Sequence, residues 1–447
     1  MGTGKAAQAI AWCAAITLTA RHATGNWQLA RTLAWLRRAG DEPATGHELP
    51  PVHVIVPVLR EQQHVSAALE WWQQILPQFP GMSLTIVSTA REERERDHLT
   101  AAVCSASRLT RTGFPQLSDR ELADLTSARV SAGGQLAPET AALILARTPL
   151  TREVVGRFLA RTYALLSRPG QLPAVVQPHA LHVVTRAGQP LARRALVCGS
   201  AALQSVWTLR REIPYARRYQ QSAGRPRVLA RLRAGLPQPV GHGVFFRQDV
   251  LAQIGGLPEM TVLDDVPAGV MLALRGVPAV SVSALAAVPA PATVGEVIAQ
   301  HRRWFCSYLD YPAVLRAAAR ACPGHAGHRY LLSGIAAYRG AAWLGASPLT
   351  AVTLVTAAWP GSGRKLRVTA GAGLILATVV PAIMATRARH GRIRAGHAAR
   401  DSLELLAAYL LRSTGPWLAV SDAARGRHPV SAAAPAPKTH HREGAVP

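Results

Sequence analysis

The sequence predicts an α/β fold, in which helices sandwich a parallel or mixed sheet, followed by a C-terminal region of transmembrane or interfacial helices. β-branched runs at 52–58 and 83–89 are typical of buried parallel strands. Residues 62–76 between them have a helical pattern, so the three segments form a strand–helix–strand unit with a right-handed crossover. Two uncharged runs within 340–386 approach the length that crosses a bilayer.

The composition excludes several classes of protein. Hydrophobic residues make up 49% of the 447 residues and charged residues 17%, which excludes a mainly disordered chain. The 36 glycines and 32 prolines follow no three-residue period, so the chain is not collagen-like. The five cysteines are scattered without a Cys-x-x-Cys pair. This pattern argues against a zinc site or a disulfide framework and favours a reduced, cytosol-facing compartment.

The chain is strongly basic. Its 50 Lys and Arg residues against 25 Asp and Glu give a net charge of +25, which favours anionic partners such as phosphorylated substrates or an acidic bilayer surface. The same charge suggests a nucleic-acid binder as an alternative. However, the arginines are spread along the whole chain, without interleaved aromatic residues or a recognised binding module. We therefore expect no nucleic-acid partner.

Residues 1–48 are expected to form an N-terminal unit of apolar and amphipathic helices. The apolar run 6–20 is short for a spanning helix, and no convincing cleavage site follows it. The segment 27–38 is basic and amphipathic. We expect the apolar run to lie in or against a membrane; a helix buried against the protein is the alternative.

Residues 313–427 are expected to form a helical membrane region, and residues 428–447 a disordered tail. The uncharged runs 340–359 and 368–386 flank a Pro-Gly-Ser-Gly turn and predict a transmembrane hairpin. A buried helical pair is the alternative. More arginines follow the second run than lie in the turn, so both outer flanks, and the domain before them, are expected on the cytoplasmic side. The stretch 403–420 suits an interfacial helix.

The domain between these parts, residues 49–312, is expected to carry the chemistry. Ligands of α/β sheets gather at the carboxyl ends of the strands, so the segments that follow predicted strands are the candidates. These segments are PVLRE at 57–61, STARE at 88–92, the stretch 241–276 and QHRRW at 300–304.

In this order and spacing, the four segments resemble the processive, membrane-anchored bacterial members of the inverting family-2 glycosyltransferases, which have the GT-A fold. The family opens with Pro-x-x-Asn-Glu, which corresponds to PVLRE with Arg60 in place of Asn. Its glycine-rich stretch, acidic Glu-Asp pair and Gln-x-x-Arg-Trp motif correspond to residues 243–256, Asp264–Asp265 and 300–304. The resemblance implies a Rossmann-like GT-A domain over about residues 50–312, with membrane helices after it.

The resemblance also implies a role for each matched residue. Asp265 matches the general base, which takes the proton of the acceptor hydroxyl while that oxygen attacks the anomeric carbon. Asp264 beside it would raise the pKa of Asp265 by like-charge repulsion and so make Asp265 a better base. Donor or nucleotide binding is implied for Pro57, Glu61, Thr89, Arg302 and Arg303, the arginines as bidentate phosphate ligands. Acceptor or saccharide binding is implied for Gln300, Trp304 and His242.

Each candidate also has a plainer structural explanation. The Asp264–Asp265 pair is suited to cap a helix over 266–275, and capping is compatible with catalysis. The segment 302–304 fits a basic juxtamembrane helix with a buried tryptophan, and Glu61 and His242 fit ordinary solvated loop positions.

The family's Asp-x-Asp, whose divalent cation bridges the two donor phosphates, is missing from this sequence. Its spacing before the strand at 173–184 places it near 144–151, a stretch without a carboxylate. The acid that usually ends the second strand is replaced by Ser88 and Thr89. The metal ligands are therefore unknown, and a Mg or Mn cofactor rests on the family resemblance alone. Arginines that neutralise the phosphates are the alternative.

Together these features predict a membrane-associated glycosyltransferase of an envelope polysaccharide pathway. It would transfer a sugar, with inversion, from a nucleotide-diphosphate sugar to a lipid-linked or saccharide acceptor. The alternative is a catalytically impaired relative that acts as a binding or scaffold protein of such a pathway. The missing Asp-x-Asp favours the alternative, whereas Asp265 and QHRRW favour the enzyme.

Overall fold

The computed structural model describes the central sheet and most of the helices of the chain. The described residues are 2–38, 52–58, 82–88, 141–144, 174–184, 190–222, 244–254, 265–323, 325–390 and 395–427. For the first three strands the description covers the backbone.

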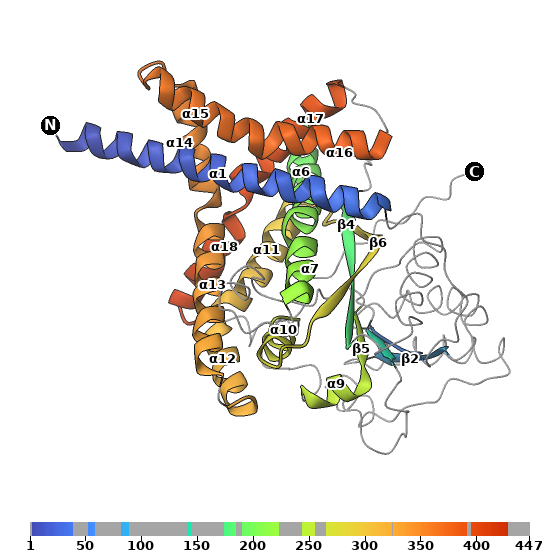
Figure 1. The fold of residues 1–447 in the computed structure, drawn as a ribbon. Coiled ribbons are helices and arrows are strands. Elements are labelled where there is room, and N and C mark those ends of the chain that lie inside the picture. The colour runs from blue at the N-terminus through green and yellow to red at the C-terminus, as the bar shows by residue number, and fades with distance from the viewer. Residues whose placement is uncertain are drawn as a thin grey trace.

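Six described strands form one mixed sheet (Figure 1). They are β1 (Val52–Val58), β2 (Met82–Ser88), β3 (Ala141–Ile144), β4 (Val175–Val183), β5 (Val244–Arg247) and β6 (Ala279–Pro289), in the order β2-β1-β3-β5-β4-β6. β5 runs antiparallel to its neighbours β3 and β4, whereas the other neighbouring pairs are parallel. The carboxyl ends of the parallel strands and the start of β5 therefore lie at one edge. The predicted α/β class with a mixed sheet is confirmed.

The sequence predicts β1, β2 and β4, and VGHGVFF at 240–246 has a strand pattern that covers most of β5, whereas β3 and β6 are missed. Both missed strands are rich in alanine, and β6 also contains serines, so the local sequence shows little β-propensity. Their neighbours hold them in the sheet, since β3 pairs with β1 and β5, and β6 pairs along the length of β4. The helix expected over 62–76 lies outside the described residues.

The N-terminal segment is one continuous helix, α1 (Gly2–Arg38), and the expectation of separate apolar and amphipathic helices in residues 1–48 is wrong. No proline interrupts the segment. Ala15 packs against Ala370 in the C-terminal part of the chain, whereas Ile10 is 62% exposed. One face of α1 is therefore buried against the protein, as expected for the alternative of a buried helix. Another face is exposed.

The C-terminal helices gather at one end of the molecule. They are α13 (Ala326–Leu344), α14 (Ala346–Ala358), α15 (Arg364–Leu374), the π-helix η5 (Ile375–Val379), α16 (Val380–His390), α17 (Ala395–Leu411) and α18 (Thr414–Ala424). In Figure 1, α1 crosses the molecule beside α14, α15 and α16, and these helices form a layer together with α17.

The structure describes the segment expected to form a transmembrane hairpin, and its membrane character stays a prediction. Among the described residues, one helical stretch, Arg364–Arg387, is long and apolar enough to cross a membrane by length and composition, and it includes the run 368–386. The first run, 340–359, is divided by a bend of 49° between α13 and α14. Pro348 in the first turn of α14 has no N–H to continue the hydrogen bonds of α13. The stretch 403–420 is divided between α17 and α18.

The main hydrophobic core extends across residue 312, where the sequence suggests a domain boundary. The helices involved are α9 (Gln248–Gln253), α10 (Asp265–Leu274), α12 (Tyr311–Ala321) and α13. Phe246 of β5 and Val270 of α10 share this core with Val314 of α12 and Leu332 of α13. All four side chains are almost fully buried. The first C-terminal helices are therefore packed as part of the sheet domain.

A long helical stretch connects the sheet to the C-terminal helices. It consists of α6 (Leu191–Trp207), the π-helical turn η4 (Thr208–Glu212) and α7 (Ile213–Ser222). α6 packs against β4 on one side and α17 on the other. At Gly199 the two helices approach so closely that a Cβ atom would lie 1.8 Å from the carbonyl oxygen of Glu404. Only glycine allows this contact.

Replacing Gly199 by alanine is expected to lower the free energy of unfolding by about 3 kcal/mol, because the backbones of α6 and α17 must separate. Gly334→Ala is the matched control, since a Cβ atom there meets no atom within 4 Å and alanine favours the helix by about 1 kcal/mol. Thermal unfolding of both variants in detergent solution tests this. Equal melting temperatures for the two variants would contradict the close packing.

Candidate functional site

Asp265 is the first residue of α10, the helix whose remaining residues are all buried. This burial fixes the position of the helix, and the helix dipole favours a negative charge at this end. Burial raises the pKa of Tyr308, Arg339 and Arg412 lower it, and the charge of Asp265 raises it further. The Asp265 carboxylate therefore lies within electrostatic reach of Tyr308. Its predicted neighbour Asp264 lies outside the described residues.

Helix α11 (Val294–Leu309) carries both Tyr308 and the QHRRW segment. Its start is fixed by a local capping arrangement. The Thr293 hydroxyl accepts a hydrogen bond from the Glu296 N–H at 3.2 Å, and the Glu296 carboxylate accepts one from the Ala292 N–H at 2.9 Å. Trp304 lies one turn before Tyr308, so the charge of Asp265 acts on a side chain of the helix that carries QHRRW.

The His301 ring belongs to a cluster of aromatic side chains on α11 and α13. The His301 ring centroid lies 6.0 Å from that of Trp304 and 5.7 Å from that of Trp343, and Tyr308 lies 6.1 Å from Trp343. Phe305 completes the cluster, 5.8 Å from Trp343. Burial, helped by the charge of Arg412, lowers the pKa of His301 to about 3, so this histidine is neutral.

The other residues of the segment differ in their surroundings. Arg302 forms an ion pair with Asp422 of α18, and the two helices touch at Gly415, where a Cβ atom would lie 2.6 Å from the backbone nitrogen of Arg302. The Arg302 guanidinium therefore holds α18 against α11, and its part in donor binding stays a prediction. Gln300, Arg303 and Trp304 are partly buried.

Several predicted site residues lie beyond the part of the chain that the structure describes, namely Glu61, Thr89, His242 and Asp264. Pro57 lies in β1, where its backbone is paired with Val87 of β2. β3 ends at Ile144 beside β1 and β5. The stretch 144–151, where the Asp-x-Asp is expected, therefore begins at the carboxyl end of a parallel strand; its sequence has no carboxylate and includes Arg147.

A metal site is not supported by the residues that are present. Among the described residues, no three His, Cys, Asp or Glu side chains lie close enough together to hold a metal ion. The whole sequence contains no Asp-x-Asp. The described residues and the sequence motifs therefore offer no set of ligands for the cation that the family resemblance implies.

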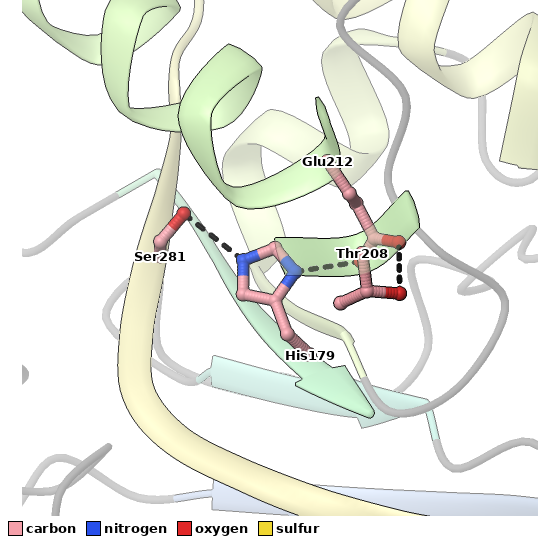
Figure 2. Close-up of polar contacts among 4 residues, drawn as sticks. All are labelled: His179, Thr208, Glu212 and Ser281. Atoms are coloured by element: carbon pink, nitrogen blue, oxygen red, sulfur yellow. Dashed lines mark hydrogen bonds and ion pairs between the residues drawn. The ribbon is translucent and has the colours of Figure 1, made fainter. Parts of the chain in front are cut away.

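A buried polar network joins the sheet to η4 (Figure 2). His179 of β4, fully buried, has its Nδ1 atom 2.6 Å from Glu212 Oε1 and its Nε2 atom 3.0 Å from the Ser281 hydroxyl of β6. Thr208 donates to the other Glu212 oxygen at 3.1 Å. Because the carboxylate only accepts, Nδ1 of His179 carries the proton that points to it. Sequence analysis misses this network, since nothing local connects its members.

Three arginines surround one tyrosine on α7. Arg211 donates to the Tyr215 hydroxyl at 3.1 Å, and the Cζ atoms of Arg218 and Arg339 each lie 4.7 Å from the centroid of the Tyr215 ring. Burial would raise the pKa of Tyr215, but the charges of Arg211, Arg339 and Arg218 outweigh it and lower that pKa. We refer to Arg211, Tyr215, Arg218 and Arg339 as the arginine cluster. In the sequence, this cluster is indicated only by the four-residue spacing of Arg211 and Tyr215, which places them on one face of a helix.

Comparison with known proteins supports a glycosyltransferase. Residues 215–387 match the family described as glycosyl transferase family group 2, over less than half of the chain. The matched segment includes Asp265, the QHRRW segment and most of the arginine cluster. This match confirms the prediction of a glycosyltransferase and, with the mixed sheet, supports a GT-A-like architecture.

The other comparisons add less. No curated protein sequence matches the chain. A solved mannosyltransferase from Pyrobaculum calidifontis, in complex with GDP-Man and Mn2+, aligns with 85% of this chain and 99% of its own, at 17% identity and a TM-score of 0.39. Such a distant likeness carries no conclusion about the fold or the substrate of this chain.

The buried pair of His179 and Glu212 is expected to be essential for stability. Glu212→Ala leaves a buried histidine without its acceptor and is expected to cost about 3–5 kcal/mol of unfolding free energy. Asp249→Ala, which breaks a partly exposed pair with Arg247, is expected to cost less than about 1 kcal/mol. Denaturant unfolding of the two variants measures both values. A cost for Glu212→Ala as small as that of Asp249→Ala would refute the role of the network.

His301 is expected to make the fold sensitive to acid. Because the pKa of His301 is lowered from 6.5 to about 3, the unfolded chain takes up a proton there below pH 6.5 and the folded chain does not. This contribution to stability is complete above pH 6.5 and decreases by about 1.4 kcal/mol per pH unit as the pH falls towards 3. His301→Gln is expected to remove that slope. Unfolding free energies at about pH 7 and about pH 5 check it; an unchanged slope in the variant contradicts the burial of a neutral ring.

Proposed function

We propose that this glycosyltransferase is membrane-associated and transfers a sugar, with inversion, from a nucleoside-diphosphate sugar to a lipid-linked or saccharide acceptor. The catalytic domain faces the cytoplasm, and the pathway is that of an envelope polysaccharide. The observation that carries the proposal is the position of Asp265, at the amino end of a fully buried helix and within electrostatic reach of Tyr308, on the helix that holds QHRRW.

The proposed chemistry needs one base. The Asp265 carboxylate accepts the proton of the acceptor hydroxyl while that oxygen bonds to the anomeric carbon. The bond from the anomeric carbon to the diphosphate oxygen breaks on the opposite face, which inverts the configuration. The nucleoside diphosphate leaves with the bonding electron pair. A base held rigidly by a buried helix keeps its oxygen aligned with the acceptor, which is how enzymes gain from orientation.

Membrane association is supported by the surface of the helical layer. Large apolar side chains are exposed on α1, α14, α15 and α17, where Ile10 is 62% exposed, Val355 61%, Val368 64% and Leu403 68%. Apolar surface of this extent on neighbouring helices is typical of contact with a membrane or a partner. The candidate span Arg364–Arg387 belongs to the same layer. Its basic flanks are consistent with a cytoplasmic catalytic domain.

The second candidate function is a non-catalytic relative that binds a donor or a saccharide without transferring it. The missing Asp-x-Asp favours it. The two candidates differ in one measurable property, because only the enzyme releases nucleoside diphosphate from a nucleotide sugar.

Asp265→Asn is expected to reduce transfer by about 10²–10⁴-fold, because the amide cannot accept the proton. The measurement is release of nucleoside diphosphate from UDP-glucose, UDP-N-acetylglucosamine and GDP-mannose by the purified chain in detergent. Asp249→Asn is the control, since Asp249 is partly exposed and has no predicted role in catalysis or binding.

Two results would count against the proposal in different ways. Full activity in Asp265→Asn would exclude this carboxylate as the base. No release from any nucleotide sugar by the wild-type chain, together with measurable binding of one, would favour the non-catalytic candidate.

A further inference from the structure

We propose that the arginine cluster is a binding site for a diphosphate group, formed by Arg211, Arg218 and Arg339 around Tyr215, in place of the metal ion that the family uses. The identification of the donor as the source of this diphosphate rests on the proposed function. The site itself rests on geometry and charge.

The three guanidinium groups come from two helices and converge on one ring. Arg211 and Arg218 extend from the stretch that contains η4 and α7, and Arg339 extends from α13. Arg211 is bonded to the phenol hydroxyl, while Arg218 and Arg339 stack on the ring. All of these side chains are partly buried, so they are held in place yet reach the surface.

The cluster has no anionic counterpart among the described residues. Some described arginines elsewhere are paired with a carboxylate, as Arg247 with Asp249, Arg302 with Asp422 and Arg400 with Glu404. No described carboxylate forms an ion pair with Arg211, Arg218 or Arg339. Partly buried cations that lack a counter-ion repel one another and attract an anion.

Neighbouring arginines increase this positive charge. Burial lowers the pKa of Arg218, Tyr215 raises it, and the charges of Arg211, Arg31 and Arg339 lower it again. The neighbouring Arg217, whose Cζ lies 4.6 Å from the ring centroid of Trp35, has a pKa lowered by burial and by Arg31 and Arg38 of α1. The positive region therefore extends from α13 across α7 to α1.

Two donors of the cluster are already used, since Arg218 Nε donates to the Pro214 carbonyl and Arg211 to the Tyr215 hydroxyl, and the geometry leaves other N–H groups available. A guanidinium that stacks on an aromatic ring uses its flat face, so its N–H edges can still donate to phosphate oxygens, often two at a time. One terminal nitrogen of Arg339 is buried without a hydrogen-bond partner in the described part of the chain. The Tyr215 hydroxyl accepts from Arg211 and can donate its own proton to an anion. A diphosphate supplies several oxygens and more than one negative charge to match these donors.

The charges of Arg339 in the cluster and of the proposed base both affect Tyr308. Tyr308 is influenced by the charges of Arg339 and of Asp265, which places both within electrostatic reach of the same hydroxyl. A leaving diphosphate held by Arg339 would therefore depart near the carboxylate that activates the acceptor. A cation at this position stabilises the charge that develops on the leaving oxygen.

The test is binding of inorganic pyrophosphate, UDP and GDP to the purified full-length chain by calorimetry, with EDTA present, and for the wild-type chain also without EDTA. Arg339→Gln and Arg218→Gln are each expected to weaken binding about tenfold or more, since each removes a charge-assisted contact. Arg320→Gln on α12, which is exposed, is the matched control and is expected to bind normally. Thermal unfolding of each variant verifies that it is folded, and Arg339→Lys, which keeps the charge, is expected to recover part of the affinity.

A second arm distinguishes the source of the diphosphate. Sedimentation with phosphatidylglycerol vesicles, compared with neutral phosphatidylcholine vesicles, measures binding to lipid phosphate. Loss of pyrophosphate and nucleotide binding in the cluster variants, with vesicle binding unchanged, supports the donor site. Loss of vesicle binding alone overturns the diphosphate site in favour of a lipid headgroup contact. Unchanged binding of every probe, or binding that EDTA abolishes in the wild-type chain, also overturns it.

These outcomes separate the two proposals. Cluster-dependent pyrophosphate binding without any sugar transfer leaves the diphosphate site in place and removes the proposed function. Sugar transfer that depends on Asp265, together with normal nucleotide binding in the cluster variants, supports the proposed function and removes the diphosphate site.

Discussion

A carboxylate buried between the sheet and a π-helical turn determines the arrangement of the surrounding helices. Glu212, at the end of η4, is held by His179 of β4 and by Thr208 of its own turn (Figure 2). A buried charge is tolerated only with such partners, so η4 has one position on the sheet. Successive residues of this turn point in different directions, as in any helix. Arg210 therefore reaches the N-terminal helix, and Arg211 reaches Tyr215.

The same turn links the sheet domain to the apolar layer. Arg210 donates to His22 Nδ1 at 3.1 Å and also bonds to Asn26. Burial and the charge of Arg210 hold the pKa of His22 well below its usual value, so the ring is neutral and can accept this bond. Arg210 and Asn26 both donate to the carbonyl of Leu376 in the second π-helix, at 3.3 Å and 2.9 Å. The candidate membrane span is thereby connected through one buried arginine to the turn that carries Arg211.

Much of the fold follows from the sequence, and the failures have physical causes. β1 and β4 are evident from their β-branched runs. Helix α10 is evident from Asp265 at its start and the apolar residues that follow it. β3 and β6 are alanine-rich, and only pairing with their neighbours makes them strands.

The site was predictable to a smaller extent than the fold. Motif order indicates Asp265 and QHRRW because family resemblance preserves short segments, and the charge of Asp265 acts on Tyr308 of the QHRRW helix. The network of Glu212 and the arginine cluster depend on contacts between residues far apart in the sequence, such as Tyr215 and Arg339, which no local pattern encodes.

The proposed site is tested most directly by a structure of the full-length chain with a bound nucleotide sugar in the presence of EDTA. We expect the diphosphate to contact Arg218 and Arg339, and the anomeric carbon of the sugar to face Asp265. A donor bound elsewhere, with the arginine cluster empty and Asp265 remote from the sugar, would contradict it.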